Sequence, residues 1–157
     1  MGYIFSSYQI ADLAAHLEAE GAAYYKGVAA RMDDADLRAV FSRLAQMELE
    51  HRMFFHALAR QMEDGAAPQE YVVDVEGILR TEVEKIRRAF IDASSLAAGT
   101  MRPRDALAVA ISLEETSICV YSAIREKFSE RFSGALDRIL AEEKEHLKIF
   151  ERAKGRT

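Results

Sequence analysis

The stretches Glu48-Leu49-Glu50-His51 and Glu143-Lys144-Glu145-His146 decide the fold. In both, a glutamate precedes a histidine by three positions, which places the two side chains on one face of a single helix. Apolar residues share that face, so we expect it to be buried. They are Leu44, Phe55 and Leu58 around the first motif, and Ile139, Leu147 and Phe150 around the second. The chain has 4 His, so one such pair could arise by chance, but two matched pairs need an explanation.

A second pattern repeats in step with the first. Glu18 and Tyr25 are seven positions apart, as are Glu114 and Tyr121, which puts each pair two turns apart on one helical stripe. Glu18 precedes Glu48 by 30 residues, and Glu114 precedes Glu143 by 29. The chain therefore contains two copies of one helical hairpin, related by a pseudo-twofold axis.

The periodicity of apolar residues predicts an all-α fold, since no segment alternates with a period of two. We expect helices over about 7–31, with Ser6 and Gln9 at capping-box spacing, over about 34–63, capped by Asp33 or Asp34, and over 103–127. A last helix follows a turn at 129–133. An amphipathic run with Leu79, Val83, Ile86 and Phe90 lies between the two hairpins. The expected architecture is a single domain over 1–157: a four-helix bundle with hairpin 1 at about 7–63, a long helical crossover at about 64–102, and hairpin 2 at about 103–154.

Composition excludes several classes of protein. The chain has 157 residues, of which 50% are apolar and 30% are charged, as in a globular domain. A net charge of −5 disfavours nucleic acid as a partner. A single cysteine, Cys119, excludes a disulfide framework within the chain. No apolar run reaches the roughly 18 residues that a membrane span needs, so we expect a soluble, cytoplasmic protein that binds no membrane.

The repeated motifs point to metal ions. Four carboxylates cannot share a dry core without a compensating charge, because each isolated buried ion costs several kcal/mol. Two divalent cations would balance the four negative charges of Glu18, Glu48, Glu114 and Glu143. Two imidazoles complete a set of oxygen and nitrogen ligands that suits iron, manganese or zinc.

These motifs resemble the rubrerythrin-type branch of the ferritin-like di-iron carboxylate proteins, over residues 8–153. The resemblance implies two iron ions, with Glu18 and Glu114 as mainly terminal ligands and Glu48 and Glu143 as bridging ligands. By the same resemblance, one imidazole caps each metal, and two tyrosine hydroxyls orient the carboxylates. The implied metal ligands are Glu18, Glu48, His51, Glu114, Glu143 and His146, and the implied orienting residues are Tyr25 and Tyr121.

Two features depart from that family. Typical rubrerythrins carry a rubredoxin module with four cysteines, which this chain lacks. They also carry a further glutamate one turn after the fourth-helix ligand, where this chain has Ser117. Both departures bear on the peroxidase reaction rather than on the metal site.

The expected function is therefore that of a di-iron oxidoreductase in oxidative-stress defence. It would reduce hydrogen peroxide or dioxygen with electrons from an external donor, such as a rubredoxin-like or flavin protein, and a homodimer is the expected assembly. The alternative is a ferroxidase or iron-sequestration protein of the same ferritin-like class. A third class, a metal-free helical interaction module, leaves the four buried carboxylates without a purpose.

Other polar and sulfur-containing residues have simpler interpretations. Glu20, Glu50, Glu142 and Glu145 are expected on the solvated face, and Lys85, Arg87 and Arg88 on the solvated side of the crossover. His16 and His56 lack a glutamate three positions earlier. Met47, Met53 and Phe54 are expected to pack in the core, and Cys119 to be a buried, inert thiol.

Overall fold

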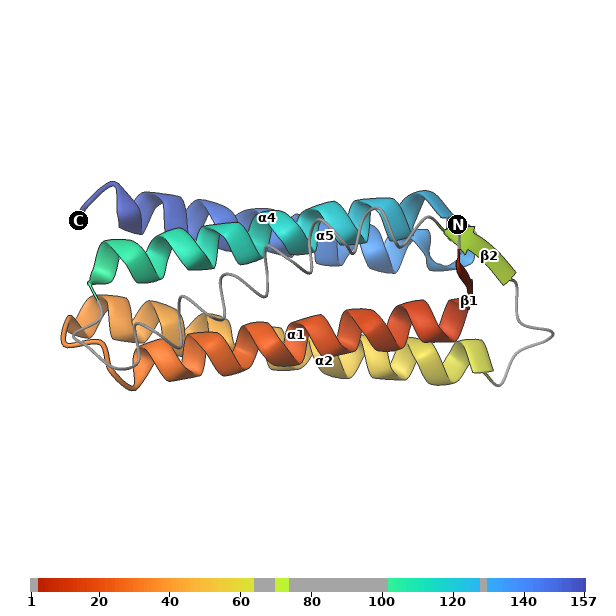
Figure 1. The fold of residues 1–157 in the computed structure, drawn as a ribbon, viewed down its shortest axis with the longest axis horizontal. Coiled ribbons are helices and arrows are strands. Elements are labelled where there is room, and N and C mark those ends of the chain that lie inside the picture. Colours follow the sequence, from red (N-terminus) through yellow and green to blue (C-terminus); the bar gives the residue numbers. More distant parts are fainter. Residues whose placement is uncertain (1–2, 64–69, 74–101, 128–129) are drawn as a thin grey trace.

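The computed structural model describes residues 3–63, 70–73, 102–127 and 130–157. Its described part contains four long helices: α1 (Ser7–Ala29), α2 (Ala35–Glu63), α4 (Pro103–Lys127) and α5 (Glu130–Lys154). α1 and α2 form one antiparallel hairpin and α4 and α5 form the other, and the two hairpins pack face to face (Figure 1). The all-α bundle of two hairpins predicted from the sequence is confirmed.

Helix boundaries follow the local chemistry of the sequence. Asp34 caps α2, because its Oδ1 accepts a hydrogen bond of 2.9 Å from the backbone N–H of Leu37. Pro103 opens α4, where its missing N–H costs nothing. α1 begins at Ser7, directly after Ser6, as predicted, and Ser6 itself is the last residue of a strand. One end differs from expectation, because α5 begins at Glu130, within the stretch expected to be a turn.

A short antiparallel ribbon was not predicted. β1 (Tyr3–Ser6) pairs with β2 (Glu70–Val73), with Tyr3 opposite Val73 and Ser6 opposite Glu70. The sequences YIFS and EYVV are rich in aromatic and β-branched residues, which favour strands. Four residues are too few for a period of two to stand out from the surrounding helical pattern. The ribbon joins the start of α1 to the chain beyond α2.

The end of α2 and the start of α4 lie at opposite ends of the bundle (Figure 1). This placement of the two ends is what a crossover at 64–102 requires, and the crossover itself stays a prediction. The helix expected within that crossover, and its basic residues Lys85, Arg87 and Arg88, lie outside the described residues.

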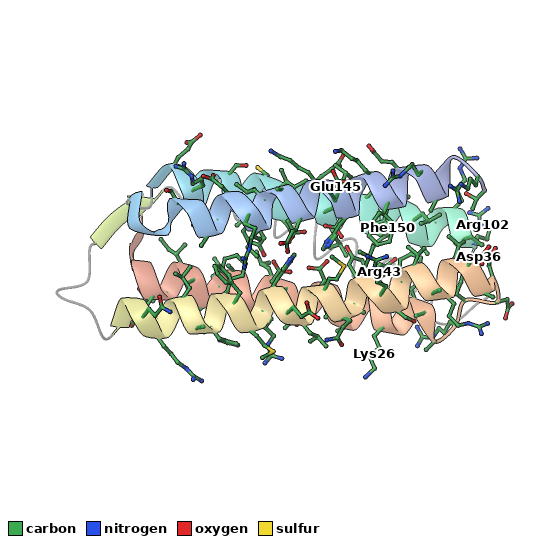
Figure 2. The ribbon with its side chains drawn as sticks, turned by 180° about the vertical axis from the view of Figure 1, so that it is seen from behind. Lys26, Asp36, Arg43, Arg102, Glu145 and Phe150 are labelled. Atoms are coloured by element: carbon green, nitrogen blue, oxygen red, sulfur yellow. The ribbon has the colours of Figure 1, made fainter. Side chains whose placement is uncertain are left out.

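The core consists of two apolar clusters separated by a polar layer. One cluster includes Tyr24, Phe41 and Phe150, and the other includes Phe55 and Ile139. Phe150 points into the bundle, whereas Lys26 points away from it (Figure 2). In each helix the residues of the two clusters lie on either side of the Glu or Glu-x-x-His motif in sequence. The motifs are therefore held between two packed apolar layers.

α4 is more apolar than expected, since no run of about 18 apolar residues was predicted. By length and composition, Pro103–Glu126 is long and apolar enough to cross a membrane. In the bundle its apolar face is used for packing, since Ala106, Leu107 and Ala110 are completely buried. Glu114 lies on that buried face as well. Packing of α4 against α5 and α1 therefore uses part of its apolar surface, and 41% of the apolar window is buried.

Candidate metal centre

The structure brings together all six residues predicted as metal ligands. Each is at most 3% exposed, and each of the four helices contributes at least one. α1 and α4 supply one glutamate each, and α2 and α5 supply a glutamate and a histidine each. The residues are Glu18, Glu48, His51, Glu114, Glu143 and His146.

Glu48 and Glu143 occupy the centre of the group. Nδ1 of His51 lies 2.8 Å from Oε1 of Glu143 and 3.5 Å from Oε2 of Glu48. Nδ1 of His146 lies 3.1 Å from Oε1 of Glu48 and 3.5 Å from Oε2 of Glu143. Each of these two carboxylates therefore directs one oxygen toward each imidazole, which is the arrangement that two bridging carboxylates require.

Glu18 and Glu114 lie at the periphery, one beside each histidine. Oε2 of Glu18 is 3.9 Å from Nδ1 of His51, and Oε2 of Glu114 is 3.8 Å from Nδ1 of His146. The group thus divides into two equivalent halves, each with its own terminal glutamate and imidazole. The half that contains His51 is called the His51 half, and the other the His146 half.

Two buried tyrosines hold the second oxygen of each terminal carboxylate. The hydroxyl of Tyr25 donates to Oε1 of Glu114 at 2.6 Å, and that of Tyr121 donates to Oε1 of Glu18 at 2.5 Å. Both bonds run between α1 and α4, so each tyrosine acts on the carboxylate of the other hairpin. The hydrogen bonds that were predicted to orient the carboxylates are present. It was not predicted that each tyrosine would act on a carboxylate of the other hairpin.

Several buried oxygen and nitrogen atoms in this group have no hydrogen-bond partner within the described part of the chain. They are Oε1 of Glu48, Nδ1 of His51, both carboxylate oxygens of Glu143 and both ring nitrogens of His146. Buried polar atoms are nearly always paired, and leaving them unpaired is costly. The approach of Nδ1 of His51 to Glu143 is short, yet it does not have hydrogen-bonding angles. These atoms instead point toward one shared space between the side chains.

A cation would satisfy those atoms. One nitrogen or oxygen atom from each of four residues lies within 4.8 Å of the other three, and the residues are Glu48, His51, Glu143 and His146. Carboxylate and imidazole donors without thiolates suit iron, manganese or zinc. The residues present therefore fit a metal centre, and the pseudo-twofold arrangement suits two ions rather than one.

Electrostatics separates the four carboxyls into two classes. Burial raises the pKa of Glu18 and Glu114 well above the ordinary value, because the charged form loses its hydration. Burial acts in the same direction on Glu48 and Glu143, but other interactions outweigh it and the pKa of each is lowered. For Glu48 these are hydrogen bonding with Glu18 and then with the two imidazoles, and for Glu143 they are hydrogen bonding with the imidazoles and then with Glu114. Without metal, Glu48 and Glu143 are therefore the two carboxyls that carry a negative charge.

The two histidines complement that charged pair. Burial alone would lower the pKa of an imidazole, but the facing carboxylates of Glu143 and Glu48 reverse the effect. They raise the pKa of His51 to about 11 and that of His146 to about 9. Two imidazolium and two carboxylate charges thus offset one another, and two metal ions would take over the role of the protons.

One contact of the centre was missed by sequence reasoning. Oε2 of Glu142 lies 2.8 Å from Nε2 of His51. Glu142 was expected to be an ordinary residue of the solvated face, but its side chain is only 41% exposed because it reaches back to α2. Its position directly before the bridging candidate Glu143 was a hint, but it did not specify the contact, which depends on how close α5 lies to α2.

Of the other expectations about single residues, some are confirmed and some are wrong. His16 and His56 are largely exposed, with side chains 71% and 43% exposed, and neither belongs to the cluster. Cys119 is exposed, so the prediction of a buried thiol is wrong. Met53 is 71% exposed, so its predicted core packing is also wrong, because it lies on the outer side of α2. Met47 and Phe54 do pack against the core.

A narrow opening between α1 and α4 leads to the centre. Its volume of about 20 Å³ leaves room for a species the size of a water molecule. Three of the six candidate ligands line it, together with a further carboxylate and small residues. The lining includes Glu18, Glu48, Glu114, Glu20, Gly21 and Ser117.

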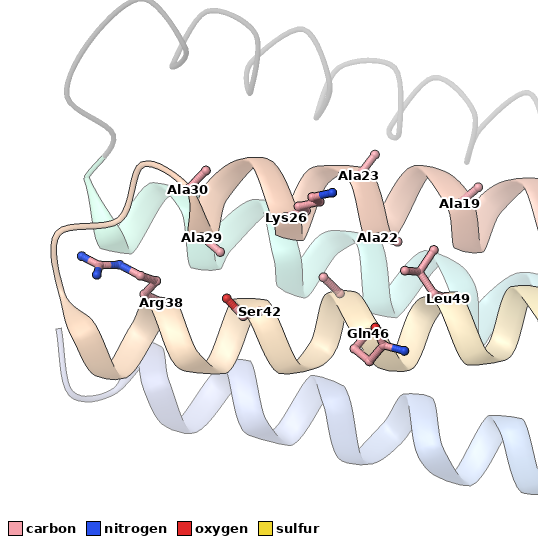
Figure 3. A pocket seen from close by; sticks show the side chains of 11 residues that line it. Ala19, Ala22, Ala23, Lys26, Ala29, Ala30, Arg38, Ser42, Gln46 and Leu49 are labelled. Atoms are coloured by element: carbon pink, nitrogen blue, oxygen red, sulfur yellow. The ribbon is translucent and has the colours of Figure 1, made fainter.

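A larger hollow of about 630 Å³ lies on the outer side of α1 and α2 (Figure 3). Alanines form much of its wall, and Lys26 and Arg38 are its charged residues. It shares no residue with the metal-ligand candidates, so it is separate from the centre.

No protein-family model and no curated protein matches this chain. The structure is similar to the crystal structure of a Thermotoga maritima protein assigned as a ferritin-like diiron-carboxylate protein. The two superpose with a TM-score of 0.70 at 21% sequence identity, over 98% of this chain and 97% of that one. Together with the two helical hairpins, this likeness shows that the chain has a ferritin-like helical bundle fold.

Proposed function

We propose that the chain is a di-iron oxidoreductase that reduces hydrogen peroxide or dioxygen with electrons from an external donor. The observation that carries the proposal is the convergence of four carboxylates and two imidazoles in a dry layer between two apolar clusters. Such a layer is costly unless cations occupy it. The likeness to a protein assigned as a diiron-carboxylate protein favours iron over manganese or zinc.

In this proposal Glu48 and Glu143 would be shared between the two ions, and each half would add its terminal glutamate and its histidine. When bound, two ferrous ions supply two electrons, which is the number that converts hydrogen peroxide and two protons into two waters. Tyr25 and Tyr121 keep one oxygen of each terminal carboxylate fixed, so that the other oxygen faces the metal position. The surrounding apolar clusters exclude bulk water from the layer.

In this proposal an external protein returns the electrons to the iron. A rubredoxin-like or flavin protein is the proposed donor, and a cytoplasmic homodimer is the proposed form of the enzyme. The position one turn after Glu114 is Ser117, which lines the opening between α1 and α4 and offers no carboxylate to the metals.

The proposal is tested by titrating the metal-free protein with ferrous iron in the absence of oxygen. Binding should saturate near two ions per chain, and hydrogen peroxide should then oxidise the iron faster than air does. Glu48→Ala and Glu143→Ala should each abolish binding of the pair. Glu50→Ala is the matched control, because Glu50 is an exposed glutamate of the same helix. Binding of two ions by either bridging variant would contradict the assignment.

A second candidate, ferroxidase activity with iron sequestration, is favoured by one observation. The opening between α1 and α4 is lined by four acidic side chains, Glu18, Glu20, Glu48 and Glu114, whose oxygens are ligands for an entering cation. Faster oxidation of the bound iron by air than by peroxide, followed by binding of fresh ferrous iron, would support this candidate. Light scattering would then be expected to reveal an assembly of many chains.

A further inference from the structure

The two halves of the centre are not equivalent at the outer nitrogen of each histidine. Both imidazoles turn Nδ1 toward the carboxylates. Nε2 of His51 then meets Oε2 of Glu142, on α5, at 2.8 Å. Nε2 of His146 is buried and has no hydrogen-bond partner among the residues that the structure describes.

The sequence repeat explains this difference. Glu142 directly precedes Glu143, and the residue that directly precedes the corresponding Glu48 is Met47. Met47 packs against the apolar cluster, and a thioether is only a weak hydrogen-bond acceptor. The pseudo-twofold axis therefore relates a carboxylate in one half to a thioether in the other.

A carboxylate at the outer nitrogen changes how an imidazole binds metal. It holds the N–H on Nε2, fixes the ring so that Nδ1 carries the lone pair, and makes that nitrogen a stronger donor. Loss of such a partner typically weakens metal binding 10- to 100-fold. The two rings stack with centroids 5.4 Å apart and planes at 16°, and each faces the carboxylates of both Glu48 and Glu143.

We propose that Glu142 is a positioning residue that makes the two metal positions unequal, so that the His51 half binds its ion first and more tightly. This inference rests on the proposed metal-binding function and adds an order of filling to it. The charge of Glu142 acts through His51, since Glu142 is on the outer side of that ring and reaches the centre only through it.

Zinc is a suitable probe, because it binds the same donor types and undergoes no oxidation. Calorimetric titration of the metal-free protein with Zn²⁺ should show two binding events per chain, about 10- to 100-fold apart in affinity. Glu142→Ala should weaken the tighter event by about that factor and leave the stoichiometry at two. Glu142→Gln keeps an acceptor without the charge, so its affinity should lie between those of the wild type and the alanine variant.

Glu145→Ala is the matched control, because it removes one exposed carboxylate from the same helix and should leave both events unchanged. The order of filling is read from the ring nitrogens of ¹⁵N-labelled histidine. Less than one equivalent of Zn²⁺ should shift the signals of His51 before those of His146. In Glu142→Ala this order should be lost.

The outcomes separate this inference from the proposed function. If the wild-type protein bound no metal, both would be overturned. If it bound two Zn²⁺ but Glu142→Ala left both events unchanged, or weakened both by the same factor, only the role of Glu142 would be overturned. Filling of the His146 half first would overturn it as well.

Discussion

The hydroxyl of Tyr121 on α4 donates a hydrogen bond of 2.5 Å to Oε1 of Glu18 on α1. Tyr25 on α1 makes the reciprocal bond to Glu114 on α4. Each hairpin thus supplies the donor that orients a carboxylate of the other hairpin. Since α1 and α4 belong to different copies of the repeat, the centre forms only when the two hairpins meet.

Replacing Tyr121 by Phe tests this arrangement. The ring is retained in its packed site against Phe55, but Oε1 of Glu18 loses its donor. A buried polar atom left without a partner costs about 1–3 kcal/mol, so the free energy of unfolding of the metal-free protein should fall by about that amount. Metal affinity should fall too, because Glu18 is no longer held. Chemical denaturation and Zn²⁺ calorimetry measure the two effects.

Tyr24→Phe provides the control for that variant. Its hydroxyl donates to the backbone oxygen of Ala106 at 3.2 Å, and no candidate ligand is involved in that bond. This variant should lose stability without losing metal affinity. Equal losses of metal affinity in Tyr24→Phe and Tyr121→Phe would show that the hydroxyl of Tyr121 has no special role at the centre.

Metal binding should release protons. In the metal-free protein the facing carboxylates raise the pKa of His51 to about 11 and that of His146 to about 9, despite the opposing effect of burial. Both imidazoles are therefore charged at pH 7, and both must lose a proton before they can bind metal. Glu18 and Glu114, whose pKa values are raised by burial, add to the release wherever they are protonated.

The sign of the pH dependence follows from this linkage. Lowering the pH adds protons that compete with metal, so affinity should fall steadily from pH 9 downward. At pH 7 at least two protons should leave for each pair of ions. Calorimetry in buffers of different ionisation enthalpy counts them, and a binding enthalpy that did not depend on the buffer would contradict the prediction.

The same pKa values set the stability of the metal-free protein. Because the folded-state values lie above the ordinary 6.5, the two histidines stabilise the fold fully below that pH. This stabilisation should diminish as the pH rises through about 9 and on to about 11. Denaturant midpoints measured across that range should fall in metal-free protein and fall less in zinc-loaded protein. A flat profile without metal would argue against the imidazolium–carboxylate pairs.

The sequence was sufficient for the helices and the cluster because both depend on spacing. Glu-x-x-His places two side chains on one helical face, and its repetition predicts that four helices meet around one layer. Helix periodicity also predicted α1, α2 and α4 to within two residues at either end. These are local properties of the chain, and tertiary contacts only reinforce them.

The features that were missed depend on neighbours in space. In the sequence Glu142 looks like an ordinary charged surface residue. It contacts His51 only because α5 packs close to α2. Cys119 sits in an apolar stretch, but its own direction on α4 is outward. The ribbon of β1 and β2 unites segments more than sixty residues apart, a pairing that no local pattern specifies.

The cap of α2 gives a prediction about the fold alone. Asp34 accepts the hydrogen bond of the Leu37 N–H, so Asp34→Ala should lower the free energy of unfolding by about 1 kcal/mol. Asp33→Ala, at the adjacent exposed residue, should change it by less than about 0.5 kcal/mol. Neither change should alter metal affinity. Thermal denaturation measures both variants. A larger loss of stability in Asp33→Ala than in Asp34→Ala would show that Asp33, and not Asp34, caps the helix.

Substitutions at two glycines of α1 separate an effect on the entry of metal from an effect on stability. A Cβ added at Gly21 would lie 3.7 Å from Cγ of Glu48, an ordinary contact, and would narrow the opening between α1 and α4. A Cβ at Gly27 would meet nothing within 4 Å. Alanine is the better helix former, so both Gly21→Ala and Gly27→Ala should stabilise the protein by about 0.5–1 kcal/mol.

Only Gly21→Ala should slow the entry of metal, because only Gly21 of the two lines the opening. Stopped-flow mixing of metal-free protein with Co²⁺ measures the rate, and equilibrium titration checks that the final affinity is retained. Equal uptake rates in the two variants would mean that ions reach the centre by another route. A slower rate in Gly21→Ala with unchanged affinity would identify the gap between α1 and α4 as the entrance, since a disturbed Glu48 would alter the affinity as well.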